Sequence, residues 1–203
     1  MRLGAVVPGA GRSRRMGSEK ILLPFGRATM LETVLAKLAG AGVSRIAVIL
    51  RPDLTAAARI ARDAGAEVLT NPDPDDEMLV SIRLGVGLLL PAADALFIWP
   101  ADHPAVAPET LDVLIAAASR QTVVLPLHGG RRGHPALAGA DVLAGIGEIP
   151  PGEGLRGLWR ERADSVREVD VADPGVIENL DNPETYERAR RREEERGENG
   201  AGR

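Results

Sequence analysis

The chain has 203 residues, a formal net charge of −4 and no cysteine, which excludes disulfide bonds and thiolate metal sites. Two Trp, one Tyr and two Phe leave few stacking platforms, and together with the acidic balance they argue against a nucleic-acid partner. No apolar run approaches the roughly 20 residues of a membrane span and no signal-peptide layout precedes the first strand, so we expect a cytoplasmic protein without a membrane contact.

Short apolar runs alternate along the chain with segments of helical periodicity. Strands are predicted at residues 3–7, 45–50, 67–69, 95–99, 122–126 and 166–171, and helices at 30–41, 55–64, 79–90 and 108–119. This alternation is typical of an α/β fold, a mostly parallel, Rossmann-like three-layer sheet with helices on both faces.

Past residue 128 the pattern loosens. A short helix and a loop are expected over 136–151, and a closing helix from Pro183. The length favours a single domain, which we place at 1–191. Residues 192–203 are rich in Arg, Glu, Gly and Asn without an apolar face, so they are predicted to be a disordered charged tail.

The first predicted strand runs into a glycine-rich loop, residues 8–20, with the sequence PGAGRSRRMGSEK. Glycines let the backbone approach a ligand closely and point successive N–H groups at it. Three arginines and Lys20 add cationic donors, so the loop indicates a polyphosphate site. Its spacing matches neither the dinucleotide fingerprint nor the Walker loop. Arg15 and Lys20 are expected to contact phosphate, whereas one of Arg12 and Arg14 could face solvent.

Open parallel sheets bind ligands beyond the carboxyl ends of their strands. The glycine-rich loop, Asn71 and Asp102 each follow a predicted strand, so they are expected at one edge of the sheet. Asp102 lies in a turn between Pro100 and Pro104, where its carboxylate suits Mg²⁺, which prefers hard oxygen ligands. The structural alternative for Asp102 is an Asx-turn or helix-start residue.

Residues 8–20 resemble the signature L-A-A-G-x-S-x-R-M-G-x-x-K of the MobA-like nucleotidyltransferases. The matching positions are Ala10, Gly11, Ser13, Arg15, Met16, Gly17 and Lys20. Pro8 and Gly9 stand where leucine and alanine are usual, and Ala10 leans to the cytidylyl branch. Further resemblances follow in the family's order, at Asn71-Pro72 with Ser81, Pro100 to Pro104, Gly133-His134-Pro135, Gly152 to Arg156 and Asn179 to Glu184.

This resemblance implies a fold of the nucleotide-diphospho-sugar transferase type. It implies transfer of NMP from an NTP, with CTP favoured, to a phosphorylated acceptor, with release of pyrophosphate and dependence on Mg²⁺. Molybdopterin is the implied acceptor, which would place the protein in molybdenum cofactor biosynthesis. A transient contact with a molybdoenzyme maturation partner is a further implication.

The resemblance also assigns roles to individual residues. The catalytic residues would be Arg15, Lys20 and Asp102. The metal ligands would be Asp102 and Asp181, and the acceptor would be bound by His134 and Arg156. The nucleotide would be bound by Pro8, Gly9, Ala10, Gly11, Arg12, Ser13, Arg15, Lys20, Asn71 and Ser81.

Several of these residues have structural alternatives. Ser81 could be a helix cap and Asp181 an acid at a helix N-terminus. His134 could serve only its tight turn, and Arg156 could form an ion pair within its helix. Two alternative functions also stay open. One is the same chemistry on a sugar phosphate, methylerythritol phosphate or phospholactate. The other is a non-catalytic nucleotide-binding regulatory protein, against which the joint presence of Arg15, Lys20 and Asp102 argues.

Overall fold

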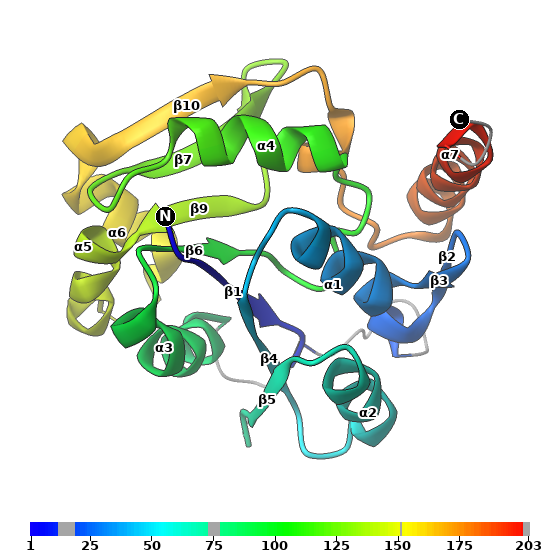
Figure 1. Ribbon diagram of the computed structural model, residues 1–203, viewed down its shortest axis with the longest axis horizontal. Helices are drawn as coiled ribbons and strands as arrows, with labels where there is room; N and C mark the ends of the chain where they lie inside the picture. The colour runs from blue at the N-terminus through cyan, green and yellow to red at the C-terminus, as the bar shows by residue number, and fades with distance from the viewer. Residues whose placement is uncertain (12–18, 73–77, 151, 201–203) are drawn as a thin grey trace.

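The computed structural model describes residues 1–11, 19–72, 78–150 and 152–200. Its middle layer is a sheet with the strand order β10-β7-β9-β6-β1-β4-β5, and β8 pairs with β7 (Figure 1). The strands of this sheet are β1 (Leu3–Pro8), β4 (Arg45–Leu50), β5 (Glu67–Thr70), β6 (Ala95–Ile98), β7 (Val123–His128), β8 (Arg131–Arg132), β9 (Ala136–Gly139) and β10 (Val166–Asp170). A separate ribbon pairs β2 (Pro24–Phe25) with β3 (Ala28–Thr29).

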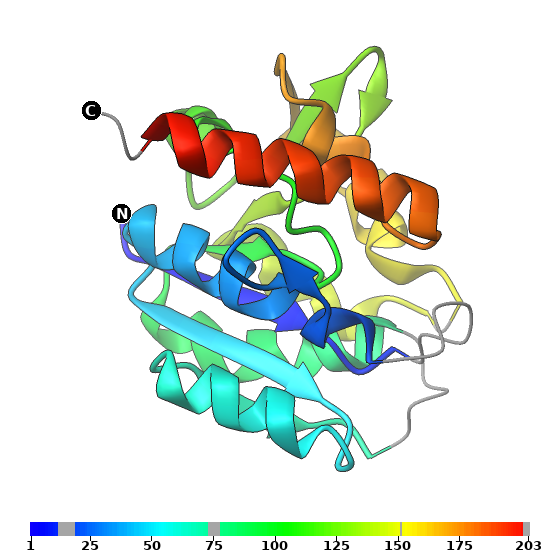
Figure 2. The same cartoon turned by 90° about the vertical axis from the view of Figure 1, so that its right-hand side faces the viewer.

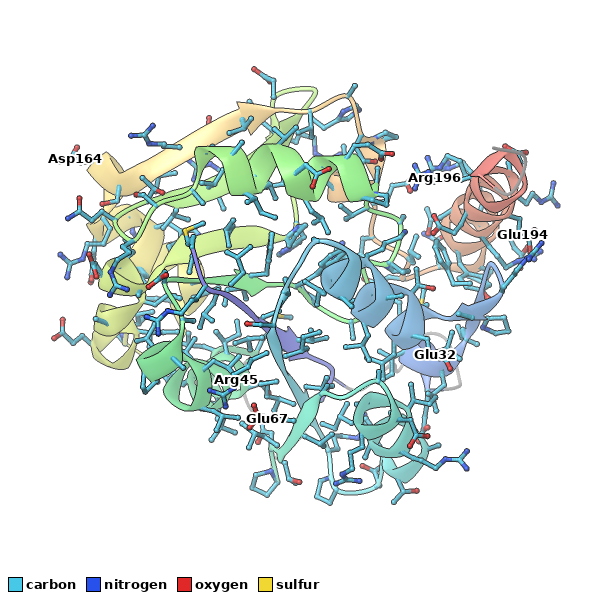
Figure 3. The ribbon with its side chains drawn as sticks, viewed as in Figure 1. Glu32, Arg45, Glu67, Asp164, Glu194 and Arg196 are labelled. Atoms are coloured by element: carbon cyan, nitrogen blue, oxygen red, sulfur yellow. The ribbon has the colours of Figure 1, made fainter. Side chains whose placement is uncertain are left out.

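The central strands are parallel, as the sequence predicts. β1 pairs in parallel with β4 and with β6, β4 with β5, and β7 with β10. At the start of β4 and β5, the Nη2 atom of Arg45 lies 2.7 Å from Oε1 of Glu67, an exposed ion pair across the two strands (Figure 3). Because β1, β4, β5 and β6 run in parallel, their carboxyl ends lie at one edge of the sheet.

The two-residue strands β2, β3 and β8 and the longer strand β9 were not predicted. Residues 136–151 are expected to form a short helix and a loop, but Ala136–Gly139 is the buried strand β9, antiparallel to both β6 and β7. Its sequence Ala-Leu-Ala-Gly contains no β-branched or aromatic residue, so local β-propensity is low. Gly139 fits because a Cβ there would come within 2.2 Å of the Arg120 carbonyl oxygen. Residues 136–139 therefore form a strand because they pack between two other strands, and not because of their local propensity.

Helices cover both faces of the sheet (Figure 1). The α-helices are α1 (Met30–Gly40), α2 (Thr55–Asp63), α3 (Met78–Leu89), α4 (Pro108–Ala117), α5 (Ala140–Leu143), α6 (Gly154–Glu161) and α7 (Pro183–Gly200). Short 3₁₀ turns lie at η1 (Lys20–Leu22), η2 (Leu90–Ala92), η3 (Ala144–Glu148), η4 (Ala163–Ser165) and η5 (Pro174–Ile177). The predicted helices 30–41, 55–64, 79–90 and 108–119 agree with α1 to α4 within two residues at each end.

The hydrophobic core has a part on each face of the sheet. Alternate side chains of β1 point to opposite faces, so Ala5 and Val7 belong to one part and Val6 to the other. The first part is closed by α1, α2 and α4, and the second by α3, α5 and α6. The predicted three-layer α/β architecture is therefore confirmed. Within the described residues, no helix is long and apolar enough to cross a membrane.

The prediction of a disordered tail from residue 192 is wrong for residues 192–200, which belong to α7. This helix lies beside α1 and the β2–β3 ribbon (Figure 2). Tyr186 and Ala189 of α7 are buried in a cluster with Phe25. Further along the helix, Oε1 of Glu193 lies 2.7 Å from Nζ of Lys37, whose side chain is 9% exposed. The composition of the tail does not indicate this helix, because the segments it packs against, α1 and the β2–β3 ribbon, lie far away in the sequence.

We expect Glu193→Gln to lower the free energy of unfolding by about 1 to 3 kcal/mol, because the Lys37 ammonium then loses its carboxylate inside the protein. Urea denaturation measures this difference. Glu195→Gln is the matched control, since Glu195 is exposed and forms no ion pair with any described residue. Equal stabilities of the two variants would contradict a docking role for α7.

Candidate active site

Backbone hydrogen bonds bring the predicted loops together at the carboxyl edge of the sheet. The N–H of Gly9 donates to the carbonyl of Ile49 at 2.9 Å, and the N–H of Ala101 donates to the carbonyl of Pro8 at 3.1 Å. The N–H of Asn71 donates to the carbonyl of Leu50 at 2.9 Å. The loop after β1, the turn after β6 and the end of β5 are thereby held at one place, as the parallel order predicts.

Lys20 lies at the centre of this edge. It opens η1 and is 4% exposed, and its Nζ atom donates to Oδ2 of Asp102 at 3.0 Å and to Oδ1 of Asp181 at 2.6 Å. The three residues come from the end of the glycine-rich loop, the turn after β6 and the segment before α7. Three segments remote in sequence thus build one cluster, in which a single ammonium joins two carboxylates.

The two carboxylates suit a hard divalent cation. Oxygens of both reach the same nitrogen, and the side chains of Asp102 and Asp181 are 34% and 44% exposed, so each keeps part of its carboxylate open to a ligand. Among the described residues, no group of three His, Cys, Asp or Glu side chains could hold a metal. Mg²⁺ commonly takes one or two carboxylates and completes its shell with substrate phosphates and water. The donor set fits Mg²⁺, and its binding stays a prediction.

Asn71 and Ser81 touch each other. The Nδ2 atom of Asn71 donates to Oγ of Ser81 at 3.1 Å, and the two residues are 1% and 2% exposed. Ser81 is the fourth residue of α3, so it is not a helix cap. The hydrogen bond ties the end of β5 to the first turn of α3, beside the loop after β1. Nucleotide contact by either residue stays a prediction.

The start of the glycine-rich loop explains one departure from the family signature. A Cβ atom on Gly9 would lie 3.0 Å from Leu50 Cδ2 and 3.4 Å from Ile21 Cδ1, so alanine fits there only if these side chains shift. Ala10 is buried, whereas Gly11 has open space around it. The candidates Arg12, Ser13 and Arg15, together with Arg14, lie outside the described residues.

Arg51 is a residue of this site that sequence reasoning missed. It directly follows β4, and its Nη1 atom donates to the carbonyl of Gly11 at 3.0 Å while its Nε atom donates to Oδ1 of Asp53 at 2.9 Å. The signal was available, because an arginine just past a parallel strand lies at the same edge as Asp102. Arg51 therefore fixes the backbone where the glycine-rich loop begins.

A pair of histidines adjoins the carboxylate cluster. The rings of His103 and His134 lie 4.7 Å apart between centroids, and Nε2 of His103 is 3.9 Å from Oδ1 of Asp102. Burial lowers the pKa of both imidazoles, that of His134 to about 4, with the neighbouring His103 adding to the effect. Both rings are therefore neutral near pH 7. Their Nδ1 atoms are buried and have no hydrogen-bond partner among the described residues.

The low pKa of His134 predicts a pH-dependent stability. The unfolded chain takes up a proton near pH 6.5 and the folded one only near pH 4, so the free energy of unfolding falls as the pH drops through this window. The loss from this residue is about 3 kcal/mol at most. Urea denaturation between pH 4 and 7 should show a shallower slope for His134→Gln than for the unaltered protein, and equal slopes would contradict the assignment.

A cavity of about 1090 Å³ lies next to the histidine pair. We call it the acceptor cavity. Its lining includes apolar side chains of α3, β6, β7 and α6, and polar ones from β8 and α6. The predicted acceptor residues His134 and Arg156 both line it. Arg156 forms no ion pair with any described residue, so the alternative of an ion pair within its helix is not observed there.

Comparisons with known proteins identify the family to which the chain belongs. A family model described as the MobA-like NTP transferase domain matches residues 5–166. The molybdenum cofactor cytidylyltransferase of Escherichia coli (strain K12) is 24% identical over an alignment of 202 residues, which covers 94% of this chain and 96% of that protein. The 2-C-methyl-D-erythritol 4-phosphate cytidylyltransferase of Streptomyces avermitilis is 32% identical over an alignment of 127 residues, which covers 57% of this chain and 49% of that protein.

A solved structure of a nucleotidyl transferase has a similar fold. A nucleotidyl transferase from Methanothermobacter thermautotroptrophicus superposes with a TM-score of 0.82 at 26% identity, covering 95% of this chain and 97% of that one. The similarity therefore extends beyond the matched family segment, residues 5–166.

Proposed function

The chain belongs to the MobA-like NTP transferase family, and on that basis we propose that it is a Mg²⁺-dependent cytidylyltransferase. It transfers CMP from CTP to the phosphate of an acceptor and releases pyrophosphate. The acceptor we propose is molybdopterin, the choice supported by the similarity to the Escherichia coli enzyme over almost the whole chain. The observation that carries the proposal is Lys20, buried between Asp102 and Asp181 at the end of the glycine-rich loop.

Nucleotidyl transfer depends mostly on positioning and on neutralising charge. A phosphate oxygen of the acceptor attacks the α-phosphorus of CTP, and the bond from this phosphorus to the oxygen that bridges to the β-phosphorus breaks, so pyrophosphate leaves with that oxygen. The acceptor phosphate is already a nucleophile, so no general base is required. The Lys20 ammonium donates to oxygens of the α-phosphate, and the N–H groups of Ala10 and Gly11 hold the triphosphate, since that of Gly9 is bonded to Ile49.

Asp102 and Asp181 would hold Mg²⁺ beside the triphosphate. When bound, the cation supplies Lewis-acid stabilisation of the charge that develops on the phosphate oxygens. The two carboxylates would orient the cation, and the Lys20 ammonium already lies between their oxygens. Arg15 is proposed to add a further cationic contact to the phosphates.

A second acceptor is favoured by one observation. The 32% identity to the Streptomyces enzyme over 127 residues makes methylerythritol phosphate the next candidate, with the same chemistry at the α-phosphorus. A purely regulatory nucleotide-binding protein is disfavoured, because binding alone would not need an ammonium buried between two carboxylates.

Pyrophosphate release tests the proposal. CTP, GTP, ATP and UTP are each offered with Mg²⁺, alone or with molybdopterin or methylerythritol phosphate, and each reaction is repeated with a chelator. We expect release only with CTP, molybdopterin and Mg²⁺ together. Release with methylerythritol phosphate instead would replace the acceptor. Binding of CTP without release on either acceptor would contradict the assigned reaction.

A further inference from the structure

Four arginines line the acceptor cavity, and they are not equivalent. They are Arg131 and Arg132 of β8 and Arg156 and Arg160 of α6. Arg132 is paired with Glu168 of β10, and Arg160 is paired with Glu153 at the start of its own helix. Arg131 and Arg156 form no ion pair with any described residue. Two guanidinium groups at this cavity therefore have no carboxylate of the described chain to neutralise them.

The hairpin that carries Arg131 holds it in place. β7 and β8 are joined by Gly129 and Gly130, which have φ values of 56° and 75°, a backbone that tight hairpin turns require. The hairpin pairs Arg131 with His128 and Arg132 with Leu127. A guanidinium on such a short, paired strand is presented to the cavity at a smaller entropic cost than one on a long loop.

Most of the remaining lining is apolar, apart from His134 and Glu153. Leu79 and Ile82 of α3, Ile98 of β6 and Leu125 of β7 are buried there, together with Trp159 of α6. The volume of about 1090 Å³ is at the upper end of the range for small-molecule pockets and far exceeds the need of a phosphate alone. An occupant that matches this lining has an apolar body and an anionic group.

We propose that Arg131 and Arg156 together bind the anionic group of the acceptor, and that Arg131 is a specificity residue that rejects uncharged acceptors. This inference rests on the proposed function for the identity of the cavity as an acceptor site. Arginine suits the role because its planar fork of N–H donors matches phosphate oxygens. The acceptor class is therefore a phosphate ester with an apolar body.

Flavin mononucleotide and riboflavin provide a matched pair of probes, because they share a planar ring system and differ only in the phosphate. Binding is followed by flavin fluorescence with the nucleotide site saturated by α,β-methylene CTP and Mg²⁺, so that no transfer takes place. Calorimetry with the same CTP analogue, without flavin, checks the nucleotide site separately. A failure of CTP binding would count against the proposed function and is read independently of the flavin result.

The unaltered protein should bind flavin mononucleotide at least about tenfold more tightly than riboflavin, as expected for charge-assisted hydrogen bonds. Arg131→Ala and Arg156→Ala should each remove most of that preference, whereas Arg132→Ala and Arg160→Ala should change it by less than about twofold. Each of the four variants removes one positive charge, so the net charge of the protein changes equally in all of them. Equal losses in the four variants, or no preference for the phosphorylated flavin, would overturn the inference.

Discussion

Asp102→Asn is expected to lower kcat/KM for nucleotidyl transfer by at least about a thousandfold, close to 4 kcal/mol of transition-state stabilisation. Asparagine keeps the shape of the side chain and can still accept a hydrogen bond from Lys20, but it lacks the charge that holds a divalent cation. The loss should therefore fall on turnover and on Mg²⁺ dependence. Pyrophosphate release measured across Mg²⁺ concentrations gives both.

The fold should survive this change. The turn after β6 is held by backbone hydrogen bonds, from Ala101 N–H to the Pro8 carbonyl and from His103 N–H to the Pro100 carbonyl, both at 3.1 Å. The control is Asp112→Asn on α4, since Asp112 is exposed and forms no ion pair with any described residue. Circular dichroism should be unchanged in both variants. Full activity of Asp102→Asn would remove Asp102 from the reaction.

Asp181 provides an internal check on the shared site. If Asp102 and Asp181 hold one cation, removing either carboxylate weakens the binding of that same cation. The activity losses of the two single variants should then not add in the double variant. Additive losses would mean that Asp181 acts on its own, through Lys20 or through the start of α7.

The sequence predicted the features that depend on residues close together in the chain, such as the bounds of strands. β4 has the predicted bounds 45–50 because a strand buried on both faces reads as an apolar run, here Ile46 to Leu50 after Arg45. The meeting of Gly9, Asn71 and Asp102 at one edge followed from the parallel order alone. Knowing that strands run in parallel fixes where their ends lie, whatever the intervening sequence.

The sequence did not predict the features that depend on contacts between segments remote in the chain. His103 and His134 lie on separate segments, so neither residue signals its neighbour. α7 carries almost no apolar stripe past Ala189, and its docking relies on a pairing of Glu193 with Lys37 that composition does not reveal. β9 has small residues that suit a crowded position between two strands rather than a strand in isolation. Packing supplied the missing information in each case.

Lys20→Met is expected to separate metal binding from catalysis. In the described protein the ammonium of Lys20 occupies the space between the oxygens of Asp102 and Asp181, where a divalent cation would also be attracted. Methionine has a similar length and no charge, so the two carboxylates are left without this partner. Charge repulsion from the lysine disappears and Mg²⁺ should bind about five- to tenfold more tightly, equivalent to roughly 1 kcal/mol at partly exposed sites.

Turnover should change in the opposite direction. Without the ammonium, the charge that develops on the α-phosphate oxygens loses a donor, and kcat should fall by about a hundred- to a thousandfold even at saturating Mg²⁺. Calorimetry with Mg²⁺ and pyrophosphate release under saturation measure the two effects separately. Lys20→Arg should not restore the rate, because the position is 4% exposed and shaped for a compact ammonium rather than a planar guanidinium. Weaker Mg²⁺ binding by Lys20→Met would mean that the lysine assembles the carboxylates for the cation instead of competing with it.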